Sequence, residues 1–550
     1  MQDTIQTIRS ASYRFFGGTL LSRISGMARD MSMAYAFGTQ PSIAAFMIAF
    51  RFAHLLRRLF GEGALQSAFI PQFESLRHQN EERAFLFFRH LTGALALFLS
   101  ILIGFSCCIL AGVTWWTDLS ANTREVIYLT LVMLPSLLFI CLFGLNSSLL
   151  QCEKSYFTPS IAPVAFNAIW IACVFFIRHL PIAEAMPWLA LGVVFACFSQ
   201  WLLTVPQTWK SMAKASFRDH PSGDTPLSDL RLLWRPLMLG LFGVAASQIN
   251  NAVDALFARY AESEGPAFLW YAIRLQQLPL ALFSIAIAGA LLPPLARARK
   301  AQRIEEHDCF LQDALYRTWT FVLPLSAALL LVGDTCVQLL YGRGDFGPQS
   351  VVQTTYCLWA YSIGLLPSAL ILILAPASYA QNNYSLPARA SCAALVINGL
   401  LNTLFITWLG WGAVSVALAT SISAWINCLW LGSRLYQTGT SLFSLPLLMK
   451  GGCIGLATAS ALWESYQVRI QVPQLLFFSK DLLFSSLLEQ CLLLSTEISV
   501  FGSLLLLNIG ICHYLAKQCV SLRWRRSRHS MKVNVPHGGL TGEMADLIHH

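Results

Sequence analysis

Apolar runs long enough to cross a lipid bilayer recur along this chain between residues 17 and 510. A helix that crosses a bilayer needs roughly 20 consecutive apolar residues, and the short polar connections between these runs leave no room for an ordinary soluble domain. The 550-residue chain is 56% hydrophobic and only 12% charged, whereas soluble domains are about 25% charged. The sequence therefore predicts an all-α, polytopic integral membrane protein.

The expected spans are helices because a backbone in lipid must satisfy its own hydrogen bonds, and strand-like alternation is absent from the sequence. Breaks at proline, glycine and charged residues indicate about fourteen spans. They lie near residues 16–37, 43–74, 90–114, 124–150, 158–178, 187–208, 232–260, 267–296, 314–340, 353–380, 386–408, 412–433, 446–466 and 494–516. Residues 467–493 are expected to form an interfacial segment outside the membrane.

Lysine and arginine predict the orientation of these spans. They are about threefold more frequent in the even-numbered connections and the tail than in the opposite connections, which predicts that both termini are cytoplasmic. The tail segment "RWRRSRHSMK" is interpreted as an anchor beside anionic membrane lipids in preference to a nucleic-acid patch. The fifteen cysteines are scattered without zinc-like spacing, so they imply no metal.

Two parts of the chain resemble each other. "LPSLLFICLFGLNSSLLQCEKSYFTPSIAPVAFN" and "LPSALILILAPASYAQNNYSLPARASCAALVIN" share Leu-Pro-Ser, a later Gln, Tyr-x-x-Pro and a final Asn. A second match aligns Arg51 with Arg274 and Pro71 with Pro294, both at an offset of 223 residues. Such repeats are typical of carriers whose duplicated halves enclose a central cavity.

The repeat predicts four regions. Residues 1–210 and 230–440 form six-helix lobes that are related by an axis along the membrane normal, because an even number of spans preserves orientation. Residues 441–516 hold two additional spans and the interfacial segment, and residues 517–550 form a basic cytoplasmic tail.

Several arginines fall within the predicted spans. The candidates are Arg23 and Arg29 in the first span, Arg51, Arg57 and Arg58 with Glu62 in the second, and Arg274 in the eighth. A charge at the bilayer centre costs at least ~2.5–3.5 kcal/mol, so these side chains are expected to face protein, water or a ligand. The spacing of Arg51, Arg58 and Glu62 places them on one helix face. The alternative is that the arginines pair with acids or anchor helix ends.

Acids that could neutralise these arginines are few. Asp30 adjoins Arg29, and Glu62 can serve only one arginine well. The surplus of positive charge favours an anionic ligand, and the planar guanidinium group suits phosphate because it donates two parallel hydrogen bonds.

A second polar cluster is predicted in the C-terminal lobe. It comprises Gln248, Asn250, Asn251 and Asp254 on one span and Asn398 and Asn402 on another. Oxygen ligands without Cys or His suit a hard monovalent cation, so Asp254, Asn398 and Asn402 are candidate ligands of a coupling sodium ion or proton. The alternative is that these asparagines hydrogen-bond neighbouring helices.

The segment "SRISGMARDMSMAYAFGTQPSIAAFMIAFRFAHLLRRLFGEGALQSAFIPQF" resembles the N-terminal signature of the MurJ (MviN) lipid II flippases, in the multidrug/oligosaccharidyl-lipid/polysaccharide exporter superfamily. "YAIRLQQLPLALFSIAIAGALLPPLAR" resembles the eighth helix of this family, and "LLYGRGDFGPQS", which includes a glycine-rich turn, resembles one of its loops. The resemblance covers roughly residues 10–440, and the two further spans fit a fourteen-helix plan.

The resemblance implies a carrier of lipid II, an undecaprenyl pyrophosphate with a disaccharide-pentapeptide, across the bacterial inner membrane. It implies roles in a cationic cavity for Arg23, Arg29, Arg57, Arg58, Glu62 and Arg274, and Arg51 falls where the family often has another cation. Membrane lipids and cell-wall synthesis proteins are expected partners, and no nucleic acid, metal or cofactor is expected. Transport is expected to be coupled to a sodium ion or proton, or to the membrane potential. Ala44 stands where members commonly have Asp, so this cavity is expected to be more positive.

Alternatives remain open at this stage. A flippase for another polyprenyl-linked glycan shares these features, and a drug or cation antiporter would favour an acidic cavity. A membrane transferase needs a catalytic acid, and the longest cytoplasmic connection offers only Asp219, Asp224 and Asp229, dispersed. A scaffold without transport would need no inward-facing arginines. No phosphate-binding loop or hydrolase motif occurs, so no catalytic residue is assigned.

Overall fold

The computed structural model describes residues 5–60, 64–214, 248–280, 295, 298–299, 301–381, 383, 385–442, 444–475 and 487–533. All regular structure within these ranges is helical, which confirms the all-α part of the predicted fold class. The first helices are α1 (Ile5–Phe37), α2 (Pro41–Phe60), α3 (Ala64–Gln79), α4 (Glu81–Trp116), α5 (Ala121–Met133), α6 (Ser136–Cys152), α7 (Phe157–Ile177), α8 (Ile182–Leu202) and α9 (Val205–Lys214).

The second part of the chain begins with a helical segment at residues 248–261. The helices that follow are α11 (Gly265–Pro279), α13 (Ile304–Tyr341), α14 (Pro348–Ile363), α15 (Leu365–Ala380), α16 (Ser385–Thr403), the π-helix η2 (Leu404–Trp408), α17 (Val414–Gln437), α18 (Leu445–Leu475) and α19 (Leu487–Val533).

Apolar side chains cover the outside of the bundle. On α4, Leu97, Ile101 and Phe105 are all exposed, and Trp115 and Trp116 are exposed at its end. Such a surface is unfavourable in water and typical of contact with lipid, with tryptophan near the interface. Among the described residues, eight helices are long and apolar enough to span a bilayer, or nine if α5 and α6 form one span bent by 43°. The protein is therefore a multi-pass membrane protein.

Two predicted spans are bent or interrupted within the described residues. The described residues of the span expected at 43–74 belong to α2, which ends at Phe60, and to α3, which begins at Ala64, and the residues between them lie outside the described ranges. The span at 124–150 bends at Pro135, whose nitrogen cannot donate a hydrogen bond. The span at 353–380 is interrupted at Gly364, between α14 and α15, but these two helices together form one apolar span, Pro348–Ala380.

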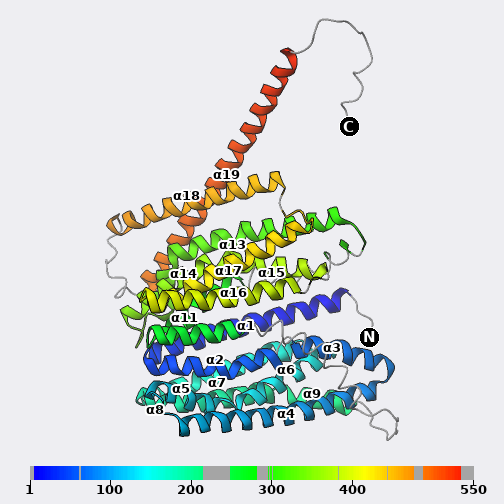
Figure 1. Cartoon of the computed structure of the whole chain (residues 1–550), viewed down its shortest axis with the longest axis vertical. Helices are drawn as coiled ribbons and strands as arrows, with labels where there is room; N and C mark the ends of the chain where they lie inside the picture. The colour runs from blue at the N-terminus through cyan, green and yellow to red at the C-terminus, as the bar shows by residue number, and fades with distance from the viewer. Residues whose placement is uncertain are drawn as a thin grey trace.

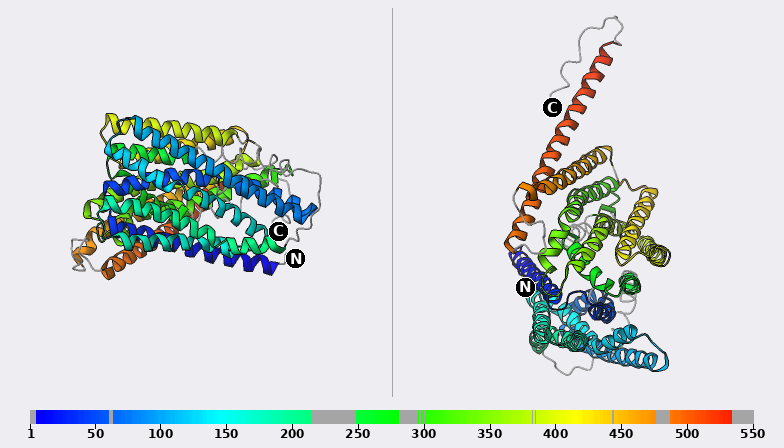
Figure 2. Two further views of the ribbon diagram at one scale, coloured as in Figure 1. Left: turned by 90° about the horizontal axis from the view of Figure 1, so that it is seen from below. Right: turned by 90° about the vertical axis from the view of Figure 1, so that its left-hand side faces the viewer.

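Two groups of helices lie side by side. Helices α1 to α9 make up the blue and cyan part of Figure 1, and α11 to α17 the green and yellow part. Helix α2 packs against α11, and α1 reaches α13, where the two groups meet. The right-hand view of Figure 2 looks along most of the helices and shows the same division. The boundary between the groups therefore brings together residues about 200 positions apart in the sequence.

The two C-terminal helices pack on α13. Arg469 of α18 bonds Asp334 of α13, and its Nε lies 3.1 Å from Oε1 of Glu497 on α19. The hydroxyl of Thr335 donates to the other oxygen of Glu497 at 3.0 Å. An arginine between two acids thus joins three helices.

The described part of the expected interfacial segment belongs to these long helices. Residues 467–475 continue α18, and residues 487–493 begin α19. Helix α19 then extends away from the bundle as far as Val533 (Figure 1), so the beginning of the basic tail continues this helix.

Candidate functional site

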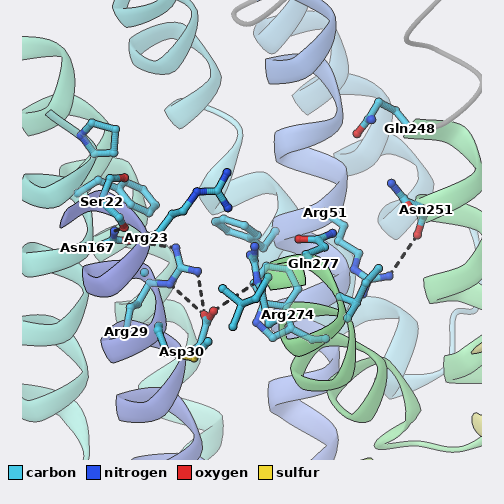
Figure 3. Close-up of a pocket in the computed structure, with 18 of the residues that line it drawn as sticks. Ser22, Arg23, Arg29, Asp30, Arg51, Asn167, Gln248, Asn251, Arg274 and Gln277 are labelled. Carbon is cyan, nitrogen blue, oxygen red and sulfur yellow. Dashed lines mark hydrogen bonds and ion pairs between the residues drawn. The ribbon is translucent and has the colours of Figure 1, made fainter. Parts of the chain in front are cut away.

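A cavity of about 390 Å³ lies where the two groups of helices meet (Figure 3). Residues from α1, α2, α7 and α8 line one side of it, and residues from the 248–261 segment, α11, α14 and α17 line the other. Its charged residues are Arg23, Arg29, Arg51 and Arg274 with Asp30 and Asp254. Four arginines against two aspartates leave two positive charges on the described lining.

Asp30 joins two of the arginines across this boundary. Its Oδ1 accepts hydrogen bonds from Nη2 of Arg29 at 2.8 Å and from Nε at 3.1 Å. Its Oδ2 lies 3.3 Å from Nε of Arg274, which comes from α11. Asp30 is 3% exposed, so little water competes with these ion pairs. One buried carboxylate therefore holds two guanidinium groups in the cavity wall.

The other predicted arginines differ in their surroundings. Arg51 donates from Nη1 to the carbonyl oxygen of Asn251 at 3.2 Å, and this contact also crosses the boundary. Arg23 has an exposed side chain that points into the cavity (Figure 3). The side chains of Arg57 and Arg58 and the whole of Glu62 lie outside the described residues.

Ala44, which the resemblance places at a position where an acid was expected, is fully buried in the core around α2. It is not part of the cavity lining. The expected acid is therefore replaced by an apolar packing contact.

Three residues with a part in this site were not identified from the sequence. Asn167 of α7 accepts a hydrogen bond from Nη1 of Arg29 at 3.2 Å, and donates to the hydroxyl of Ser25 at 2.9 Å. Trp170 and Trp270 lie under guanidinium groups of Arg29 and Arg274, respectively. A sequence signal existed for Trp270, which is four residues before Arg274 and hence on the same helix face. No such signal connects Trp170 with Arg29.

The second predicted cluster surrounds Asp254 on the wall of the same cavity. Its Oδ1 accepts from the amides of Asn398 at 2.6 Å and Asn402 at 3.2 Å. Its Oδ2 accepts from the amide of Asn250 at 3.0 Å and from the hydroxyl of Thr420 at 3.0 Å. Four donors on one carboxylate stabilise its ionised form, because an ionised carboxylate only accepts hydrogen bonds.

The other residues expected in that cluster also lie at the cavity. Gln248 and Asn251 line it, and the backbone carbonyl oxygen of Asn251 accepts the hydrogen bond from Arg51. Thr420 belongs to the cluster and was missed, because a threonine in an apolar helix carries no distinctive sequence signal. The carbonyl oxygen of the Asn402 side chain is buried without a hydrogen-bond partner among the described residues.

A contact between the two groups lies at the end of α1 remote from the N-terminus. We call it the turn–loop seal; it consists of residues 35–41, from the end of α1 to the start of α2, and residues 342–350, from the loop after α13 into the start of α14. The backbone N–H of Asp345 donates to the carbonyl oxygen of Tyr35 at 3.1 Å. The hydroxyls of Thr39 and Ser350 lie 2.7 Å apart.

Two glycines permit the close approach in this seal. Gly38 has φ +61° and Gly344 has φ +64°, values that favour glycine. A Cβ on Gly344 would lie 2.1 Å from the carbonyl oxygen of Tyr35, and one on Gly38 would lie 2.3 Å from that of Asp345. The glycine-rich turn predicted at "GRGDFG" is therefore half of a backbone contact between the groups.

A bundle of membrane helices around a polar, charged cavity is typical of membrane carriers, because a polar solute needs such a passage through lipid. Solved structures share the fold. One described as lipid II flippase MurJ in an inward closed conformation has a TM-score of 0.70 at 24% identity, covering 89% of this chain and 98% of that one. An inward-facing multidrug resistance MATE transporter of the MOP superfamily has a TM-score of 0.57 at 14% identity, covering 76% and 96%.

Sequence comparison identifies the family. The family model described as "Lipid II flippase MurJ" matches residues 33–479. A probable lipid II flippase MurJ of Chlamydia muridarum is 34% identical over 443 residues, which is 80% of each protein. The corresponding protein of Chlamydia pneumoniae is 31% identical over 436 residues, covering 78% of this chain and 77% of the relative. The chain belongs to the lipid II flippase MurJ family.

Proposed function

We propose that this protein carries lipid II, the polyprenyl pyrophosphate that bears the disaccharide-pentapeptide of peptidoglycan, from the inner to the outer leaflet of the bacterial inner membrane. Membership of the MurJ family supports the substrate. The observation that carries the proposal is the surplus of two positive charges on the described cavity lining. A pyrophosphate diester carries about two negative charges near neutral pH, and arginine binds phosphate through paired hydrogen bonds.

The proposed cycle is alternating access between two six-helix lobes, residues 1–210 and 230–440, within a fourteen-helix plan. With both termini cytoplasmic, the cavity accepts the headgroup from the cytoplasmic side while the turn–loop seal closes the outer side. The polyprenyl tail stays in lipid. Separation of the seal and closure of the cytoplasmic side then expose the headgroup outward without moving it through hydrocarbon. The helices of residues 441–516 and the tail of 517–550 are additions to these lobes.

Within the cavity, Arg23, Arg29, Arg51 and Arg274 are proposed to bind the pyrophosphate, with Arg57, Arg58 and Glu62 toward the cytoplasm. Asp30 orients Arg29 and Arg274 but leaves other N–H groups of both free to bind phosphate, since each guanidinium has five donors. Anchoring of empty arginines by a single shared acid keeps the cavity folded and cationic between transport events.

The Asp254 cluster is proposed as the coupling site for sodium or a proton. Asp254 lines the cavity, and Asn398 and Asn402 are buried beside it. The side-chain carbonyl oxygen of Asn402, which has no hydrogen-bond partner among the described residues, is a ligand of the kind that hard cations prefer. Cation binding there would require the amide groups that now donate to Asp254 to rotate. The cavity charge favours this lipid flippase over an antiporter for cationic drugs, because a cationic substrate would be repelled by the arginines.

Transport of a fluorescent lipid II in proteoliposomes tests the proposal. The protein should increase the fraction of headgroup that a membrane-impermeant quencher reaches, and a lipid-linked glycan of another structure should be moved more slowly. Arg274→Ala should weaken lipid II binding roughly 10- to 150-fold, which corresponds to a charged hydrogen bond, and Arg274→Lys should restore part of it. Arg317→Ala is the matched control, because Arg317 is exposed and pairs with Asp313 outside the cavity.

Two outcomes would contradict the proposal. One is an unchanged rate of headgroup exposure in vesicles that contain the protein. The other is a lipid II affinity of the Arg274→Ala protein equal to that of the Arg317→Ala protein.

A further inference from the structure

Two tryptophans from opposite sides of the cavity lie against its arginines. The guanidinium carbon of Arg29 is 4.9 Å from the ring centroid of Trp170 on α7. The guanidinium carbon of Arg274 is 4.4 Å from the ring centroid of Trp270 on α11. The same ring of Trp270 lies 5.8 Å from the guanidinium carbon of Arg51. All three distances are within the range at which an aromatic face attracts a cation.

Phe50 connects the two tryptophans. Its ring meets Trp170 edge to face at 5.1 Å and Trp270 edge to face at 5.5 Å. Trp170 is 1% exposed and Trp270 is 5% exposed, so packing restricts both rings. Phe50 and Trp170 belong to one group of helices and Trp270 to the other. Contact through Phe50 therefore fixes the distance between Trp170, which contacts Arg29, and Trp270, which contacts Arg274. We call the three rings the aromatic bracket.

The aromatic bracket can hold the arginines without occupying the N–H groups that bind phosphate, which carboxylates alone cannot do. A carboxylate that holds an arginine bonds the edge of the guanidinium group, which is also the edge that binds phosphate. An aromatic ring attracts the cation through its face and leaves the N–H donors at the edge free. Only Asp30 contacts Arg29 and Arg274 as an acid among the described residues, and it is shared between them. The rings therefore add support without using up phosphate-binding donors.

We propose that Trp170 and Trp270 are positioning residues that hold Arg29 and Arg274 by cation–π attraction in the orientation that binds a diphosphate. The inference rests on the proposed function of the cavity. Any large apolar side chain at these positions would pack against the arginines. The tryptophans contribute in addition an attraction that depends on the electron density of the indole ring, and substrate affinity should depend on it.

Fluorinated tryptophans test this assignment in the full-length protein. Successive fluorine atoms on the indole ring weaken its attraction for a cation while its size and shape change little. Site-specific incorporation of mono-, di- and tetrafluorotryptophan at position 270, and separately at position 170, should weaken binding of fluorescent lipid II in graded steps. The full series should reach about a 2- to 30-fold loss of affinity, the range for a partly to fully desolvated cation–π pair.

Trp319 is the matched control. It is a half-buried tryptophan on α13 whose Nε1 donates to the carbonyl oxygen of Gly451 at 3.2 Å, and it does not line the cavity. Its fluorinated series should leave lipid II affinity unchanged. Trp270→Phe should retain more affinity than Trp270→Leu at equal thermal stability, because phenylalanine keeps an aromatic face.

The outcomes separate the inference from the function beneath it. The cation–π assignment is wrong if the unmodified protein binds and moves lipid II but its affinity for lipid II does not change with fluorination of the tryptophan at either position 170 or position 270. An equal decline at position 319 would also overturn it. If the unmodified protein neither binds nor moves lipid II, the proposed function itself fails.

Discussion

Replacement of Gly344 by alanine should open the turn–loop seal. The residue has φ +64°, and an added Cβ would lie 2.1 Å from the carbonyl oxygen of Tyr35 and 2.8 Å from its ring. The backbone oxygen cannot rotate away as a flexible side chain could, so the loop must withdraw. The hydrogen bond from Asp345 N–H to Tyr35 is then lost.

The size of the effect follows from two contributions. An L-residue in the left-handed region costs about 1–2 kcal/mol, and the lost backbone hydrogen bond costs about 0.5–1.5 kcal/mol. Their sum of about 1.5–3.5 kcal/mol acts against the sealed arrangement, where contacts hold the loop at this φ. Because 1.4 kcal/mol is a factor of ten, the ratio of sealed to separated molecules should fall roughly 10- to 300-fold.

Pulsed electron–electron double resonance between two spin labels measures this ratio of sealed to separated molecules. Spin-labelled amino acids at the exposed positions Gln40 and Gln349, on either side of the seal, avoid labelling the fifteen native cysteines. The short-distance population should dominate in the parent protein and decrease in the Gly344→Ala protein.

Two other glycines provide controls. Gly347 has φ −70° with open space around it, so Gly347→Ala should leave the distances unchanged. Gly410 has φ +64° with open space, so Gly410→Ala reports conformational strain alone and should lower stability without separating the labels. An unchanged distance distribution in Gly344→Ala, or the same separation in Gly410→Ala, would refute the steric reasoning.

Three further predictions concern charged groups inside the helix bundle. Asp30→Ala leaves the buried guanidinium of Arg29 and the partly exposed guanidinium of Arg274 without their acid. It should lower the free energy of unfolding by about 3 kcal/mol, the lower end of the range for a broken buried ion pair, as measured by denaturation in detergent; an unchanged midpoint would contradict this. Asp254→Leu removes the acceptor of four hydrogen bonds, so transport rates should no longer depend on sodium or proton gradients; an unaltered ion dependence would exclude the coupling role. Arg469→Ala should loosen the packing of α18 and α19 on α13, and hydrogen–deuterium exchange of backbone amides near Glu497 should become faster. Equal exchange in the parent and Arg469→Ala proteins would show that these ion pairs contribute little.

The fold class was accessible from the sequence because lipid imposes simple rules. Apolar runs of bilayer length indicate helices wherever they occur, and the described residues are helical throughout their regular structure. The internal breaks were harder to predict. Whether Pro135 or Gly364 bends a span or divides it depends on which neighbouring helices pack against it, and hydropathy averages over such local features.

The residues of the cavity were partly accessible for the same reason. An arginine in an apolar run must avoid lipid, so Arg29, Arg51 and Arg274 could be recognised singly as residues that face the interior. Their partners could not be recognised. Asp30 was expected to serve its neighbour Arg29, and its bond to Arg274 depends on the packing of α1 near α11.

The sequence by itself determined that this is a helical membrane protein with more intramembrane arginines than acids, and its similarity to known proteins determined the MurJ family. Composition and local order are sufficient for the helical membrane class, because the bilayer excludes unpaired backbone and charge. Only the tertiary structure decided that one carboxylate serves two arginines, that Trp170 supports Arg29, and that two glycines permit close contact between the two groups of helices. These features depend on distances of a few ångströms between segments that lie far apart in the sequence, which side-chain packing sets and sequence spacing does not.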